Sequence, residues 1–275
     1  MRKTFYELLA SKDFIVYKEY KKLIDLFFVE QCAPIRSYRY PLSDYIECKY
    51  LRQMHFRGTA LTFNDILSDI DLPKISNELN DLYLLCELLT AVLIDDTVQD
   101  DSYIQEQGKT IIANIRYILE KTAHEYREDR NGNLIIVSKN NVAIHASEMV
   151  EDESVAFDLI EYNHFSIKAN LAEKKKILSS VGVYIEPILR SRTLQNAGYK
   201  TLESDAGFLF NNFHIRHNNK TGLKAQEYIQ KISDEELEKW YDRAYEVALA
   251  VIVINECLTT QTDLMDLKNK YHWKA

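Results

Sequence analysis

The segment "SDEELEKWYDRAYEVALAVIVINECL", from Ser233 to Leu258, carries a long helical pattern near the end of the chain. Ser233 followed by Glu236 is the pattern of a capping box, which starts a helix. Apolar side chains then recur every three or four residues on one wide face. They are Leu237, Trp240, Ala244, Val247, Ala248 and Val251. A face of this width predicts a helix that packs against several others in a bundle.

The composition extends this prediction to the rest of the chain. The 275 residues include only 7 Gly and 4 Pro, too few for the frequent turns of an all-β sandwich or barrel. Hydrophobic residues make up 46% and charged residues 28%, a balance that is typical of folded globular proteins. We therefore predict a mostly α-helical fold, a multi-helix bundle.

One segment, residues 126–140, departs from the helical pattern. It contains the pair Asn131-Gly132, which suits a type I′ turn, followed by the β-branched run "LIIV". We expect a small inserted β-hairpin between an N-terminal helical region, 1–125, and a C-terminal helical bundle, 141–275. Helices are expected at about 43–56, 76–95 and 103–123 in the first region, and at about 142–150, 153–170, 171–192, 202–215 and 234–258 in the second.

The charge is unevenly distributed along the chain. The formal net charge is −8, which by itself disfavours a nucleic-acid partner. Residues 171–224, however, carry nine basic and four acidic side chains, a local excess of five positive charges. Such an island is either a surface that faces phosphate or the solvated side of two helices.

Cysteine spacing and hydropathy address the cellular compartment. The 4 cysteines are far apart and lack the spacing of a zinc site, which suggests free thiols in a reducing compartment. The N-terminal segment "MRKTFYELLASKDF" has no apolar core of signal-peptide length. No later segment approaches the roughly 20 apolar residues of a membrane span. We expect a cytoplasmic protein that does not contact a membrane.

The stretch "NNFHIRHNNKTG", from Asn211 to Gly222, has an unusual composition between two apolar helical segments. Asn and Gly suit the end of a helix and a reversal of the chain, but they do not explain Arg216 between two histidines. On a helix that runs to Ile215, Arg216 would follow the apolar stripe ending at Phe213 and point near the interior or a cleft. A guanidinium placed there needs acceptors, either a carboxylate of a neighbouring helix or a bound oxyanion or phosphate.

A bundle whose penultimate helix ends in an Arg, followed by a polar residue, a short loop and a long last helix, resembles the HEPN superfamily. The segment "FLFNNFHIRHNNKTG" and its downstream helix are similar to the versions found in abortive-infection proteins, which act in antiviral (phage) defence. The resemblance implies a cofactor-free, metal-independent endoribonuclease that acts as a homodimer. It leaves open a protein partner or antitoxin. By resemblance the catalytic residues would be Arg216, His217 and His214, and the residues that position RNA would be Asn212, Asn218, Asn219 and Lys220.

The sequence departs from the HEPN pattern at one place. That pattern has a His four to six residues after the Arg, where this chain has Lys220, Thr221 and Gly222. Either His217 or His214 serves as general base, or the site binds RNA or a nucleotide without cleaving it. The alternative is a non-catalytic interaction module, in which the Arg/His/Asn cluster clamps helices or a dimer interface.

A metal site is a further alternative. Glu161 and His164 are three residues apart, which on one helix face is the pattern of a di-iron carboxylate bundle. The matching pair, Asn211 and His214, has Asn where a second Glu is required. His214 and His217 would suit one zinc ion together with Glu161 or His164, but two histidines alone are weak evidence. We expect no metal.

Overall fold

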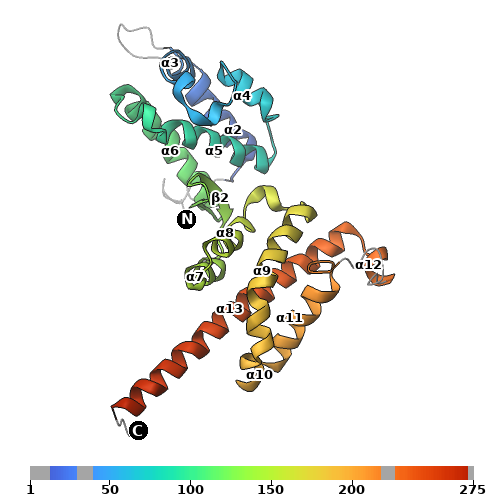
Figure 1. Ribbon diagram of the computed structural model, residues 1–275. Coiled ribbons are helices and arrows are strands. Elements are labelled where there is room, and N and C mark those ends of the chain that lie inside the picture. Colours follow the sequence, from blue (N-terminus) through green and yellow to red (C-terminus); the bar gives the residue numbers. More distant parts are fainter. Residues whose placement is uncertain (1–12, 30–39, 218–226, 272–275) are drawn as a thin grey trace, which may run out of the picture. The chain divides into compact units, whose positions relative to one another are not determined.

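The computed structural model describes residues 13–29, 40–217 and 227–271. It is mostly helical, with one two-stranded antiparallel hairpin, as the composition predicts. The chain divides into two compact units (Figure 1). The N-terminal unit comprises residues 1–128 and 133–136, and the C-terminal unit comprises residues 129–132 and 137–275.

The N-terminal unit is built around helix α5 (Leu79–Ile94), whose middle is buried on nearly every side. It also contains α2 (Val16–Phe28), α3 (Leu42–Lys49), α4 (Phe63–Asp69) and α6 (Ser102–Lys121). Helix α4 begins with a reciprocal capping box formed by Thr62 and Asp65. The helix expected at 43–56 is wrong beyond residue 49, because the chain changes there to two short 3₁₀ turns, 51–53 and 55–57.

The hairpin pairs β1 (His124–Glu128) with β2 (Leu134–Ser138). Its connection differs from the expected type I′ turn. A type I′ turn requires positive φ at both central residues, and here only Gly132 has one, at 80°. The Gly132 N–H instead donates to the Asp129 carbonyl at 3.0 Å, so the turn spans residues 129–132.

The C-terminal unit packs its helices around α13 (Asp234–Lys270), which contacts α7 (Asn141–Met149), α9 (Leu171–Ser191) and α11 (Lys200–Asn212). The remaining elements are α8 (Glu153–Glu161), the 3₁₀ turn η4 (Phe165–Ile167), α10 (Thr193–Asn196) and α12 (Glu227–Lys231). Helix α13 begins with the Ser233 hydroxyl accepting from the Glu236 N–H at 3.2 Å. Its apolar face forms the centre of this unit's core.

Three helix ends in this unit differ from those expected. The helix that begins at Glu153 ends at Glu161 rather than near residue 170, because a 3₁₀ turn follows. Helix α11 ends at Asn212 rather than at Ile215. Helix α13 continues to Lys270, twelve residues beyond the expected end at 258. By length and composition alone α13 would suffice to cross a membrane, a property that core helices of globular proteins share.

Candidate functional site

One face of α9 receives the end of α11 and the residues that follow it. Lys175, Ser179, Gly182 and Glu186 are spaced four, three and four residues apart, which places them on the same side of the helix. Each of them contacts a residue between Phe210 and Arg216. These four residues of α9 therefore form the surface against which the Arg216 segment is positioned.

The chain reverses direction directly after α11. Phe213 donates its N–H to the Leu209 carbonyl at 3.1 Å, and Arg216 donates its N–H to the Phe210 carbonyl at the same distance. His214 between them adopts a left-handed conformation, with φ of 62°, which His tolerates better than most non-glycine residues. Phe213 and Ile215 are buried at 3% and 2% exposure. Arg216 is therefore placed by this turn and not by a helix face, which corrects the expectation of a helix to residue 215.

Arg216 forms an ion pair with Glu186 of α9. Its Nη2 donates to Glu186 Oε2, while Arg190 donates from its own Nη2 to Glu186 Oε1. The hydrogen bond from Arg216 lowers the pKa of the Glu186 carboxyl below its ordinary value, and the positive charges of Arg216 and Arg190 act in the same direction. The Arg216 side chain remains 22% exposed, so the guanidinium has a carboxylate acceptor and also reaches solvent.

Gly182 allows α11 and Arg216 to approach α9 this closely. A Cβ at position 182 would lie 2.7 Å from Phe210 Cδ1 and 3.5 Å from Arg216 Cδ. The Phe210 ring is 1% exposed and has no free space to move into. Gly182 and Glu186 were not among the residues singled out from the sequence, although a glycine inside an otherwise helical pattern was an available signal.

A second set of contacts fixes His214. Lys175 Nζ lies 2.9 Å from His214 Nε2. An ammonium group can only donate, so in this contact Nε2 accepts and the imidazole carries its proton on Nδ1. The Ser179 hydroxyl lies 3.0 Å from the Ile215 carbonyl oxygen. At His214, Lys175 engages the Nε2 lone pair that a general base would use.

The other residues predicted from the sequence fall into three groups. His217 is partly exposed and follows Arg216 directly. Asn212 donates from its amide to the Phe208 carbonyl of its own helix at 2.8 Å, a contact that does not direct it to Arg216. Asn218, Asn219 and Lys220 lie outside the residues that the structure describes.

The geometry does not support the di-iron alternative. Helix α8 ends at Glu161, so Glu161 and His164 do not share a helix face. Glu161 accepts from Arg130 at 3.0 Å, and His164 Nδ1 lies 2.7 Å from the Ser166 hydroxyl. Within the described parts of the chain, no group of three His, Cys, Asp or Glu side chains is arranged to hold a metal ion.

Lys174 anchors the neighbouring side of α9 to α13. Its side chain is 6% exposed, and Nζ lies 2.6 Å from Asp242 Oδ1 and 2.8 Å from Glu238 Oε1. Tyr162 also donates to Asp242, at 2.9 Å. Lys174 and Lys175 are consecutive in α9 and therefore point in different directions. Lys174 is held in the core of the unit, and Lys175 is directed to His214. This fixed orientation of α9 determines where Glu186 and Lys175 meet the Arg216 segment.

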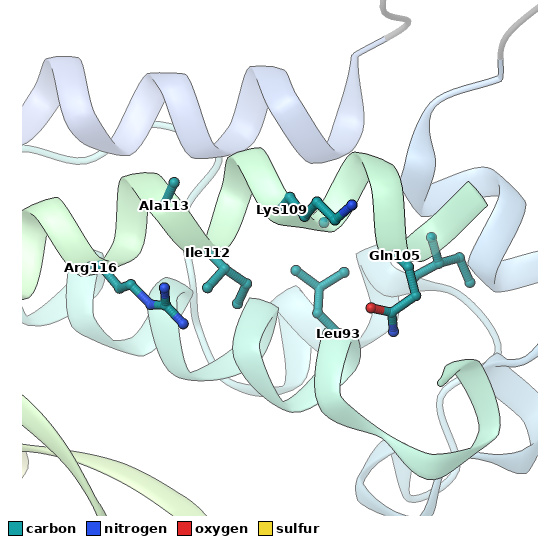
Figure 2. Close-up of a pocket in the computed structure, with 8 residues that line it drawn as sticks. Leu93, Gln105, Lys109, Ile112, Ala113 and Arg116 are labelled. Atoms are coloured by element: carbon teal, nitrogen blue, oxygen red, sulfur yellow. The ribbon is translucent and has the colours of Figure 1, made fainter. Parts of the chain in front are cut away.

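A separate pocket lies in the N-terminal unit between α5 and α6 (Figure 2). Its volume is about 370 Å³. Leu93 and Ile112 supply its apolar lining, while Gln105, Lys109 and Arg116 project from α6 around it. Lys109 is paired with Glu106 at 3.0 Å. None of the residues predicted for phosphate chemistry belongs to this pocket.

Comparison with known proteins gives no relative: no protein-family model, no curated protein and no solved structure is significantly similar to this chain.

Proposed function

We propose that the C-terminal unit is a HEPN-like module that engages the phosphate of RNA or of a nucleotide at Arg216. The observation that carries the proposal is the way in which Arg216 is held. Glu186 engages Nη2 of Arg216, and the Arg216 side chain is 22% exposed beside this ion pair. A guanidinium carries five N–H donors in a fixed fork, which suits bidentate recognition of phosphate.

The surrounding charges favour an anion. Lys175, Arg190 and Arg216 carry three positive charges, and Glu186 supplies one negative charge. Two side chains of the positive excess in residues 171–224, Arg190 and Arg216, meet at Glu186, and a third, Lys175, lies against His214. Electrostatic attraction of this kind is sequence-independent and weakens with salt, as expected for phosphate contacts.

Binding rather than rapid cleavage is the activity that we propose. His214 Nε2 accepts from Lys175, and positions 220–222 lack the histidine that the HEPN pattern has. Cleavage by attack of the ribose 2′-hydroxyl would therefore depend on His217 as the base. The proposed biological role, phage defence or toxin-like growth arrest in the cytoplasm, rests on the resemblance to abortive-infection proteins.

The test is fluorescence anisotropy of a short single-stranded RNA with the full-length protein, in EDTA, at low and at physiological salt. We expect salt-dependent binding that Arg216→Ala weakens about 10- to 100-fold, the effect of one charge-assisted contact. The matched control is Arg243→Ala, which removes another glutamate-paired arginine of the same unit, 2.8 Å from Glu246 and 69% exposed. A gel assay of the same samples shows whether the RNA is cut.

A second function, a non-catalytic interaction module, is favoured by the close packing at Gly182. In this alternative Arg216 serves only to clamp the end of α11 to α9 through Glu186. It predicts that Arg216→Ala and Glu186→Gln lower the melting temperature equally and that the wild-type protein does not retain RNA even at low salt. Phosphate binding predicts instead that Glu186→Gln, which removes a negative charge, preserves or strengthens RNA binding.

A further inference from the structure

The C-terminal end of α13 leaves the core of its unit. The last buried residue of this helix is Ile252, and every residue from Thr259 to Tyr271 is exposed. Figure 1 shows this end, in red, extending past α9, α10 and α11 of the same unit. Most helical stability in proteins comes from packing of an apolar face, so packing against a partner would stabilise this exposed extension.

Apolar side chains on the extension follow a heptad pattern. Counting forward from Ala250 in steps of three and four gives a seam, defined here as Ala250, Val253, Cys257, Thr260, Leu264, Leu267 and Tyr271. Leu264, Leu267 and Tyr271 are 49%, 51% and 70% exposed. Alternating steps of three and four residues are the pattern of the a and d positions in a coiled coil.

The seam faces away from the core of the unit. At 3.6 residues per turn the seam residues lie about 80–180° around the helix, on average about 130°, from the buried face that contains Tyr241, Ala248 and Ile252. Val253 lies in the seam and is only partly buried against the core. From Cys257 to Tyr271 every residue of the seam is exposed, so a partner helix would lie along the outside of this part of α13.

The charges beside the seam are self-complementary. With Leu264 at an a position, Asp263 is at g and Lys268 is at the following e position. In a parallel pair, g of one helix meets the next e of the other, so Asp263 of each copy faces Lys268 of its partner copy, twice by symmetry.

We propose that the α13 seam pairs with the same seam of a second copy of this chain, as a short parallel coiled coil. This inference does not depend on phosphate binding at Arg216. The apolar seam and the Asp263–Lys268 arrangement both fit an identical helix in register. In that register Cys257 of one copy faces Cys257 of the other, because a positions meet a positions across a parallel dimer.

The first experiment is sedimentation velocity of the full-length protein between about 1 and about 100 µM, a range suited to a small interface. We expect a concentration-dependent monomer–dimer equilibrium. Leu264→Asp combined with Leu267→Asp should abolish the dimer, because it places charges in the seam. Met265→Asp is the matched control: Met265 is 63% exposed on the same turn but lies outside the seam, so the dimer should persist. Arg216→Ala should also leave the dimer unchanged.

The second experiment tests the orientation. In a variant with Cys32→Ser and Cys48→Ser, Cys257 is an exposed thiol and Cys86 is buried, so a short bis-maleimide should link two chains through Cys257. Asp263→Lys and Lys268→Asp should each weaken the dimer several-fold, and the double variant should restore it. A dimer that never cross-links at Cys257 would overturn the parallel register.

Two further outcomes would overturn the pairing itself. One is a protein that remains monomeric across the whole concentration range. The other is a monomeric protein that floats with phosphatidylcholine vesicles and loses this association when Leu264 and Leu267 are replaced by Asp. The second result would show that the apolar seam contacts lipid instead of a second copy.

Discussion

Gly182→Ala should destabilise the C-terminal unit, although alanine is the better helix former. In the interior of α9 the change to alanine would by itself stabilise the helix by about 1 kcal/mol. The new Cβ, however, would lie 2.7 Å from Phe210 Cδ1 and 3.0 Å from Phe210 Cε1. Overpacking of this kind costs about 1–3 kcal/mol. The net expectation is a loss of about 1 kcal/mol in the free energy of unfolding, or roughly 2–4 °C in the melting temperature.

The matched control is Gly207→Ala in α11. A Cβ at position 207 would meet no atom within 4 Å, so the same substitution should stabilise the protein by about 0.5–1 kcal/mol. The two variants should therefore shift the unfolding free energy in opposite directions, by about 2 kcal/mol in total.

Urea denaturation followed by the fluorescence of Trp240 measures both variants. Trp240 packs against Phe213 with ring centroids 4.9 Å apart, so its signal reports on the C-terminal unit. A Trp273→Phe background removes the other tryptophan. If Gly182→Ala stabilises the protein as much as Gly207→Ala does, the close approach of α11 to α9 is refuted, and with it the placement of Arg216 against Glu186.

Two other predictions concern buried charge and acid sensitivity. Lys174→Met should lower the free energy of unfolding by about 2 kcal/mol in urea denaturation, because it leaves Asp242 and Glu238 without their cation. Lys176→Met, at a lysine that is 75% exposed, should be nearly neutral. Equal effects of the two substitutions would contradict the buried ion pairs of Lys174. At Asp101, burial favours the protonated acid, but hydrogen bonds from Tyr50, Tyr45 and backbone N–H groups prevail and lower its pKa to about 2. Because the folded-state pKa of Asp101 is depressed, its ionised carboxylate stabilises the folded protein fully above about pH 4. This stabilisation, about 1 kcal/mol after allowance for solvent screening, is lost as the pH falls towards 2. Asp101→Asn should remove this part of the acid sensitivity from a urea titration between pH 5 and pH 2, and an unchanged slope would contradict it.

Local signals in the sequence were sufficient for the long helices and for several of their starts. Apolar periodicity located α5, α6, α9 and α13, because a helix with one buried face must repeat its apolar residues every three to four positions. The Ser233 cap was recognisable because a cap needs only one side chain and the first helical turn. The end of α11 was less predictable, because tertiary contacts rather than local helix propensity decide whether the helix ends at Asn212 or continues to Ile215.

The contacts of Arg216 could not be predicted from the residues near it in the sequence. A guanidinium at the end of α11 needs an acceptor, but the residues near it in the chain do not show whether that acceptor is a carboxylate or a ligand. Glu186 is 30 residues away along the chain, and only the packing of α11 on α9 brings the two together. The same packing engages His214 with Lys175, which local spacing cannot indicate.

By itself, the sequence determined the mostly helical class, the hairpin and the polar cluster after α11, because these depend on periodicity and on residues close together in the chain. Only the tertiary structure decided which carboxylate Arg216 meets, that Gly182 makes room for Phe210, and that α13 continues beyond the core. The physical reason is that such contacts join residues remote in sequence, so their energy depends on how whole helices pack and not on any local pattern.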